Sequence, residues 1–406
     1  MSNNRKWKLV VMLGAAFVVL GWGFGITTTS NAAEKASENY RVLAPIESGN
    51  LLLFPVVRAD GKSGERSGGT GFLTLDEGIK SGEVEVTEAG KVQGLVRPRG
   101  AEPQLHSQVF RGDEVNTLVL VNNSKQPLLL LAGEIVTGGK QDRVIAKDRI
   151  VPAESNPIDL SVFCIEPGRW TESSAKFGAA ANKPVSSFMV QPTVRQQAMV
   201  AKDQRQVWNA VGGAIATMEA APPPPSAGMR PGNTSTALST SSYAKAMQDS
   251  SVSLKVDEAA APVMKSRDEV LASLRKEHAI GVVVAVRGEI LWADLFADTD
   301  LLSRYWTKLV RSYAAESLTR GETHPAPGIA DAQRFLNSPV GGTEKSEGQV
   351  GIYRYREMKS DGTDTFVLES LLPQTNYDVH ISKLKLKEGI AKVRRGPGDF
   401  HTPYPD

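Results

Sequence analysis

The residues with the clearest potential for chemistry lie in a short segment that follows an apolar run. Residues 128–131 are all leucine, and the next twelve positions contain Glu134, Lys140, Gln141 and Arg143. A guanidinium can hold a phosphate or carboxylate through two parallel hydrogen bonds. A carboxylate can act as a general base or bind ribose hydroxyls. This segment is therefore the best candidate site in the chain.

A second charged group of residues follows a later apolar run and comprises Glu166, Arg169 and Trp170. Arg169 could clamp the same anion, Glu166 could serve as the base, and Trp170 could stack on a sugar or base. The structural alternative is a set of buried ion pairs, in which Glu134 binds Arg143 or Arg169 and locks strand ends together. Both interpretations remain open on the sequence alone.

Cysteine and histidine usage argues against several kinds of site. Cys164 is the single cysteine, which excludes an internal disulfide and a Cys-rich zinc site. It lies in an apolar run with no histidine nearby in sequence, so we interpret it as a small buried hydrophobe rather than a nucleophile. The five histidines show no metal-ligand spacing. We predict no metal site and no cofactor.

Composition and motifs narrow the functional class further. The 406 residues are 41% hydrophobic and 23% charged, which is ordinary for a globular protein. A formal net charge of +2 implies no basic face, so we predict no nucleic-acid partner. The serine-hydrolase, phosphate-loop and dinucleotide motifs are absent from the strand-to-helix turns where they would act.

Residues 1–33 have the pattern of an export signal or an N-terminal membrane anchor. Arg5, Lys6 and Lys8 precede the apolar residues 9–26, and small residues follow at 30–33. An apolar run of this length is close to the minimum that spans a bilayer. We therefore expect an exported protein that is periplasmic, secreted or anchored, with membrane contact only through residues 9–26 if the segment stays uncleaved.

The elements that must position the charged residues are mostly short strands. Strand patterns within residues 40–170 fall at 51–57, 84–87, 115–121, 128–136, 144–151 and 158–165. We interpret 115–121 and 128–136 as a hairpin, and Thr74 or Asp76 as the cap of a short helix. These residues form the β-rich first half of the predicted core domain.

The second half of the chain mixes helices and strands. We predict a bridging helical segment at 171–221, with a helix near 194–218, and a mobile Pro/Ser-rich linker at 222–265 that could bind a protein partner. Residues 266–320 supply the second half of the core domain, and 345–406 a strand-rich C-terminal extension. The predicted fold class is α+β, a mainly antiparallel β-sandwich-like core with a few packed helices.

Four segments together resemble the ARG-and-rhodanese-phosphatase-superfamily-associated protein domain, in which ARG stands for ADP-ribosylglycohydrolase. The first contains Gly133, Glu134, Lys140, Gln141 and Arg143, and the second contains Cys164, Glu166, Gly168, Arg169 and Trp170. The others are residues 203–208 and 282–296. The resemblance covers roughly residues 45–320. It implies a link to ADP-ribose or nucleotide systems but no established activity, and Asp142 departs from the family's usual Asn.

Three functions from different classes are compatible with the sequence. The favoured one is a non-catalytic exported domain that binds a small polar or anionic ligand, such as a nucleotide, an ADP-ribose-like molecule or a sugar. The second is a hydrolase or transferase with Glu134 or Glu166 as base. The third is an envelope scaffold whose partner surface includes residues 222–265. A cleft around the charged residues would favour the first two.

Overall fold

The computed structural model describes most of the chain between residues 40 and 386. The described ranges are 40–59, 71–88, 117–169, 172–174, 176–178, 188–223, 240–319, 321–340, 342–373 and 375–386. The predicted export segment and Trp170 lie outside them. Among the helices of the described ranges, none combines the length and the apolar character needed to cross a membrane.

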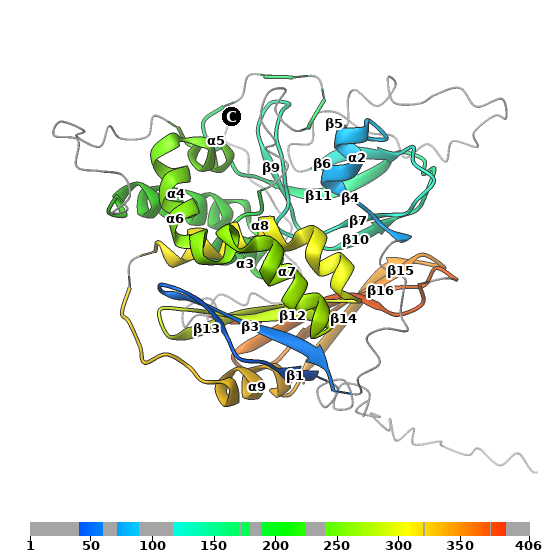
Figure 1. The fold of residues 1–406 in the computed structure, drawn as a ribbon. Coiled ribbons are helices and arrows are strands. Elements are labelled where there is room, and N and C mark those ends of the chain that lie inside the picture. Colours follow the sequence, from blue (N-terminus) through cyan, green and yellow to red (C-terminus); the bar gives the residue numbers. More distant parts are fainter. Residues whose placement is uncertain are drawn as a thin grey trace, which may run out of the picture.

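A large antiparallel sheet forms one side of the molecule (Figure 1). Its order is β1-β3-β12-β13-β17-β16-β15-β14, and β2 pairs with β3 beside β1. The strands β3 and β12 are almost wholly apolar and are buried along their length, so they occupy the middle of the core. The nine strands are β1 (Tyr40–Val42), β2 (Ile46–Ser48), β3 (Leu51–Arg58), β12 (Ala279–Val286), β13 (Glu289–Phe296), β14 (Thr343–Gln349), β15 (Tyr353–Lys359), β16 (Thr363–Ser370) and β17 (Asp378–Lys385).

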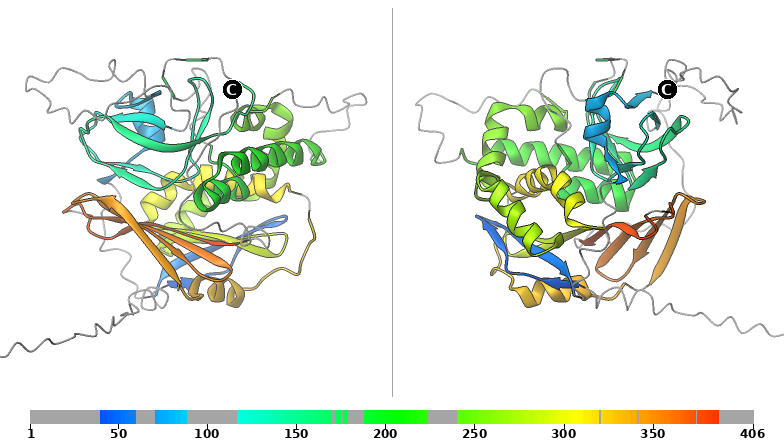
Figure 2. Two further views of the ribbon diagram at one scale, coloured as in Figure 1. Left: turned by 180° about the vertical axis from the view of Figure 1, so that it is seen from behind. Right: turned by 45° about the vertical axis from the view of Figure 1, so that its right-hand side comes forward.

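Helices cover both faces of this sheet. Helix α8 packs on β12 and β13, while α9 packs on β1 and β13 from the opposite face (Figure 1). Figure 2 shows the helices of residues 192–276 gathered beside α8. The bounds of these helices, α8 and α9 are α3 (Pro192–Gln196), the π-helix η5 (Gln197–Ala201), α4 (Gln204–Ala220), α5 (Tyr243–Gln248), α6 (Ser250–Lys265), α7 (Arg267–Lys276), α8 (Thr299–Ser317) and α9 (Ile329–Asn337).

The remaining strands form two smaller sheets on the far side of the helices, which we call the strand body (Figure 1). One sheet has the order β10-β7-β4 and the other β5-β6-β11-β9-β8. Only the β4–β7 pair is parallel among the described strands. The strand body contains β4 (Leu73–Thr74), α2 (Leu75–Ser81), β5 (Val84–Glu88), β6 (Thr117–Asn122), β7 (Leu128–Leu130), β8 (Ile135–Val136), β9 (Arg143–Ile145), β10 (Arg149–Val151) and β11 (Ile158–Cys164).

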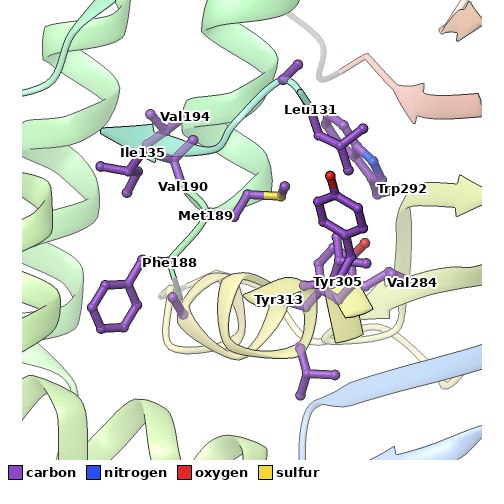
Figure 3. Close-up of a cluster of buried hydrophobic side chains, with 14 of the residues drawn as sticks. Leu131, Ile135, Phe188, Met189, Val190, Val194, Val284, Trp292, Tyr305 and Tyr313 are labelled. Carbon is purple, nitrogen blue, oxygen red and sulfur yellow. The ribbon is translucent and has the colours of Figure 1, made fainter. Parts of the chain in front are cut away.

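One hydrophobic core joins the strand body to the large sheet. Figure 3 shows Leu131 of the strand body, Met189, Tyr305 of α8 and Trp292 of β13 gathered in a single buried cluster. These side chains come from segments far apart in sequence, and all are buried. The charged segment that follows Leu131 therefore starts inside the core, and its polar groups need partners there.

The predicted α+β class with mainly antiparallel sheets is confirmed, and so is the short helix capped by Thr74. The predicted hairpin is wrong, because β6 pairs with β5 and β11 whereas β7 pairs with β4 and β10. The Asn122 side chain explains the change of sheet. Its amide donates to the backbone oxygens of Gln126 and Pro152 at 2.8 and 3.0 Å, which turns the chain away from β6.

The predicted mobile linker at 222–265 needs correction over its second part. Residues 243–265 form α5 and α6, with Ser242 and Asp249 accepting hydrogen bonds as N-caps. Val252, Val256 and Ala260 recur at every fourth position of α6 and are buried. The alanine and serine residues between them give the segment the composition of a linker, so the apolar face is not evident from composition. Residues 224–239 lie outside the described ranges.

Two other predicted segments differ from the structure. The bridging helix is interrupted at Lys202, which has a φ of +52°, and Asp203 caps the new helix α4. The C-terminal strands were predicted as a separate extension. They are strands of the large sheet, because β17 pairs directly with β13. Residues 387–406 lie outside the described ranges.

Candidate functional site

Glu134 is the first charged residue of the candidate segment, and it points into the core. Its Oε2 accepts from the Leu131 amide at 2.7 Å and its Oε1 from Lys308 Nζ at 2.6 Å. Lys308 also contacts Asp76 Oδ2 at 2.7 Å. The predicted ion pair of Glu134 with Arg143 or Arg169 is therefore wrong. Lys308 of α8 takes that place and joins two parts of the strand body.

Glu134, Lys308 and Asp76 form what we call the Lys308 triad. Burial and the neighbouring charges shift the pKa values of its members in opposite directions. Burial raises the pKa of Glu134, and the nearby Lys308 opposes that rise without cancelling it. Burial alone would lower the pKa of Lys308, but the carboxylates of Glu134 and Asp76 outweigh it and raise that pKa. Lys308 is therefore held as a charged ammonium group that two carboxylates share. The triad binds α8 to the strand body.

Glycine at position 133 is required for this arrangement. Its φ is +95°, a conformation that other residues rarely adopt. An added Cβ would also lie 2.9 Å from Cδ of Arg195. The chain can therefore deliver Glu134 to Lys308 while passing close to a buried arginine only because no side chain stands at Gly133.

Arg143 donates to the backbone oxygen of Gln141 at 2.5 Å and lies beside Glu88 and Phe177, and we call these four residues the Gln141 pocket. The Arg143 guanidinium lies 5.9 Å from the Phe177 ring centroid and 4.0 Å from Glu88 Oε1. Glu88 Oε1 also accepts from the Lys140 amide at 2.8 Å. Gln141 has 0% exposure. Neither its amide oxygen nor its amide nitrogen has a hydrogen-bond partner among the described residues.

A further cluster, which we call the Arg169 clasp, closes over the same segment. Arg169 donates to Glu166 Oε2 at 2.7 Å and to the Gly139 carbonyl at 2.8 Å, and it lies 3.3 Å from Asp142 Oδ1. Lys245 of α5 binds the other oxygen of Glu166 at 2.9 Å. The clasp thereby ties residues 138–142 to the end of β11 and to α5.

The clasp also determines the charge of its carboxylates. Burial would raise the pKa of Glu166, but hydrogen bonds from Arg169 and Lys245 outweigh burial and lower it. Burial raises the pKa of Asp142, although the Ser242 hydroxyl donates to it at 2.7 Å and opposes that rise. Glu166 is therefore a weak base held in ion pairs.

Cys164 lies at the end of β11 beside these groups. Burial raises the pKa of its thiol to about 11, with the Arg143 charge opposing the rise. The Gln204 amide pairs with its backbone N–H and C=O at 2.9 and 2.8 Å. The thiol is thus protonated at neutral pH and buried, as expected for a structural residue rather than a nucleophile.

A buried polar network, missed at the sequence level, lies where the strand body meets the large sheet. His380 Nδ1 lies 2.6 Å from Asp148 Oδ2, and His380 Nε2 lies 3.2 Å from Asp294 Oδ1. Arg195 binds the other oxygen of Asp294 at 2.8 Å, and the Tyr313 hydroxyl donates to that oxygen as well. Burial would lower the pKa of His380, but the two aspartates outweigh it and raise that pKa to about 9.

The structure thus separates the residues that the sequence grouped together. Gln141 and Arg143 share one pocket, Glu166 and Arg169 form the clasp above it, and Glu134 belongs to the Lys308 triad. The Lys140 backbone joins the pocket through Glu88. Glu88, Lys245 and Lys308 were missed. Only Lys308 had a signal, because it interrupts the apolar face of α8.

Comparisons with known proteins agree with the resemblance seen in the motifs. The model of the ARG and Rhodanese-Phosphatase-superfamily-associated Protein domain matches residues 39–384. This match extends past residue 320 through the C-terminal strands, in keeping with their place in the large sheet. Neither the curated proteins nor the solved structures gave a match. The chain belongs to the ARG and Rhodanese-Phosphatase-superfamily-associated Protein domain family.

Proposed function

We propose that this domain binds a small polar or anionic ligand in the Gln141 pocket. The observation that carries the proposal is the Gln141 carboxamide, which is fully buried and has no hydrogen-bond partner among the described residues. An unsatisfied buried donor or acceptor costs about 1–3 kcal/mol. A ligand that accepts from the amide nitrogen and donates to the amide oxygen offsets this cost.

The charge around the pocket supports an anionic ligand with hydroxyl groups. The Arg143 guanidinium lies beside Glu88 and Phe177 and supplies a positive charge that attracts a phosphate or carboxylate. Glu88 can accept from ligand hydroxyls, as carboxylates do with ribose. Gly139, with a φ of +52°, brings the backbone against Glu88 and Phe177. The favoured ligands are nucleotides, ADP-ribose-like molecules and sugars.

Access to the pocket depends on the Arg169 clasp. Arg169 holds the carbonyl of Gly139 and pairs with Glu166, so the segment over Gln141 is closed. The Lys245 side chain, which binds Glu166, is 54% exposed and lies at the outer end of the clasp. We infer that the ligand enters when the clasp opens. The apparent affinity is then the intrinsic affinity multiplied by the fraction of molecules in which the clasp is open.

A hydrolase or transferase reaction is less well supported. Glu166 has a lowered pKa and is occupied by Arg169 and Lys245, so it would be a poor base. Glu134 has a raised pKa, but both of its oxygens are occupied and it is 1% exposed. Non-catalytic binding therefore remains the favoured function.

The proposed location is outside the cytoplasm, on the basis of the signal-like residues 1–33. A partner surface within 222–265 is less favoured than a ligand site. Within the described part of this segment, one face of α5 and of α6 is buried in the core, which leaves their outer faces for a partner.

The test compares Gln141→Met with Gln197→Met in the full chain. Gln197 is a matched control, because its amide oxygen is also buried without a hydrogen-bond partner among the described residues. Thermal unfolding would be followed with and without ADP-ribose and AMP. A ligand that binds only the native state raises the melting temperature.

We expect at least one ligand to raise the melting temperature of the wild-type chain and of Gln197→Met. Gln141→Met should abolish that rise while leaving the free protein equally or more stable, because removing an unsatisfied amide relieves its desolvation cost. Loss of stability in free Gln141→Met, or an undiminished ligand response, would contradict the proposal.

A further inference from the structure

A hollow lies on the molecular surface between α7 and α8, and charged residues stand around it. It has a volume of about 420 Å³, within the range of small-ligand sites. Arg267, Leu271 and Arg275 line it at every fourth position of α7, and α8 contributes the facing wall. The α8 residues are Asp300, Ser303 and Arg304. We call this feature the α7–α8 hollow.

Most charged groups of the hollow already have partners. Arg304 binds the Glu77 carboxylate and the Phe72 carbonyl, the latter at 2.7 Å. Arg267 donates to the Thr307 hydroxyl at 3.2 Å and lies 3.4 Å from Asp268. These contacts hold two of the three guanidinium groups in place. The third guanidinium group is that of Arg275.

Arg275 and Ser303 differ from their neighbours. The Arg275 side chain is exposed and forms no ion pair or hydrogen bond with any described residue. Ser303 is 6% exposed, and its hydroxyl has no hydrogen-bond partner within the described part of the chain. A buried hydroxyl without a partner is uncommon in a native structure. A cation and a hydroxyl donor, both unpaired, thus line one hollow.

We propose that the α7–α8 hollow binds a small hydroxylated anion of the sugar-phosphate class. Arg275 receives the phosphate, and the Ser303 hydroxyl donates to it. Asp268 and Asp300, which also line the hollow, accept from the sugar hydroxyls and disfavour ligands with several separated charges. Leu271, which is buried, supplies apolar surface for the carbon skeleton.

This site is independent of the Gln141 pocket. Its residues belong to α7 and α8, whereas the pocket is built from β5, β9, the segment before β9 and Phe177. The two proposals can therefore fail separately. A variant of one site serves as a control for the other.

Calorimetric titration of the full chain with ribose 5-phosphate tests the site. Arg275→Gln should weaken binding about tenfold, because it removes a charge-assisted contact to phosphate. Ser303→Ala should weaken it by roughly threefold to tenfold, the value of one hydrogen bond. The control Arg205→Gln changes another exposed helical arginine and should bind as the wild type does. Gln141→Met should leave this binding unchanged.

Two further probes identify the recognised groups. Inorganic phosphate should compete with ribose 5-phosphate but bind more weakly, and ribose alone should show no saturable heat. Absence of saturable binding of ribose 5-phosphate to the wild-type chain would overturn the proposal. Equal weakening in Arg205→Gln and Arg275→Gln would overturn it too, as would loss of binding in Gln141→Met, which would place the ligand in the other pocket.

Discussion

Single charged residues in this protein are kept inside the core by specific partners. Glu134 is deeply buried, and an isolated carboxylate there would be costly. Its oxygens are instead divided between the Leu131 amide and the Lys308 ammonium group. The same principle governs Arg169, whose donors are spread over Glu166, Asp142 and a backbone carbonyl. Charge in the candidate segment is thus largely structural, whereas the neutral amide of Gln141 is buried without a hydrogen-bond partner among the described residues.

Replacing Lys308 with methionine should expose the dependence of Glu134 on its partner. Methionine keeps most of the side-chain volume but leaves Glu134 buried with no cation. We expect a loss of about 3–5 kcal/mol in the free energy of unfolding, measured by urea denaturation. Adding Glu134→Leu to Lys308→Met should recover much of that loss, because the uncompensated charge is then gone. A double variant no more stable than the single one would contradict this account.

The residue types of the candidate segment were predictable, but their partners were not. The order Glu134, Lys140, Gln141, Arg143 identifies a polar segment at a strand end from sequence alone. Glu134 pairs with a lysine 174 positions away. Nothing local distinguishes that partner from the nearer Arg143 and Arg169. Long-range pairing is decided by how α8 crosses the strand body, which a sequence pattern does not contain.

At the scale of helices and strands, the amino-acid composition of one segment led to a wrong prediction, whereas the spacing of its apolar residues indicated the correct structure. Residues 243–265 are rich in serine and alanine, a composition typical of linkers. Their apolar residues nonetheless recur at helical spacing, and α6 packs against α8. Strand β12 and helix α8 show the reverse case, because their long uniform or strongly periodic sequences leave little choice of structure.

The buried face of α6 gives a prediction at this scale. Val256 has 0% exposure, whereas the neighbouring Leu254 is an exposed apolar residue on the same helix. Val256→Ala should lower the free energy of unfolding by roughly 1–3 kcal/mol, because it opens a cavity in the core. Leu254→Ala removes more carbon atoms but should cost less than about 0.5 kcal/mol, because its site is on the surface.

Urea denaturation of the two variants under the same conditions gives the comparison. Equal and small effects at both positions would mean that this stretch behaves as a linker and that the helix is not packed. A large effect of Val256→Ala alone supports the packed helix seen in the structure.

At the scale of the whole molecule, buried polar groups connect the strand body to the large sheet. Asp148 comes from the strand body, while Asp294 and His380 come from two adjacent strands of the large sheet. Arg195, at the start of the bridging helices, completes the network. Asp294 lies in one of the segments that resemble the family, but no pattern in the sequence groups it with the other three residues. Their grouping depends on β17 pairing with β13, which the prediction of a separate C-terminal extension had not included.

This network should make global stability depend on pH. The folded-state pKa of His380 is raised to about 9, against 6.5 for an ordinary histidine. The folded state therefore holds the proton more tightly, so its contribution is complete below pH 6.5 and is lost as the pH rises towards 9. Between pH 6.5 and 8 the free energy of unfolding should fall by about 2 kcal/mol from this group, since each pKa unit corresponds to roughly 1.4 kcal/mol.

The range is best limited to pH 8 because Lys383 acts in the opposite direction above it. Burial lowers the pKa of Lys383 to about 8, so its contribution to stability rises as the pH increases from there. Urea denaturation at pH 6.5, 7.2 and 8 should show a falling free energy of unfolding in the wild type and in His324→Gln, which alters an exposed histidine. His380→Gln should be less stable at pH 6.5 and show a much flatter dependence. An equally steep fall in His380→Gln would assign the effect to other groups and deny that a charged histidine joins the strand body to the sheet.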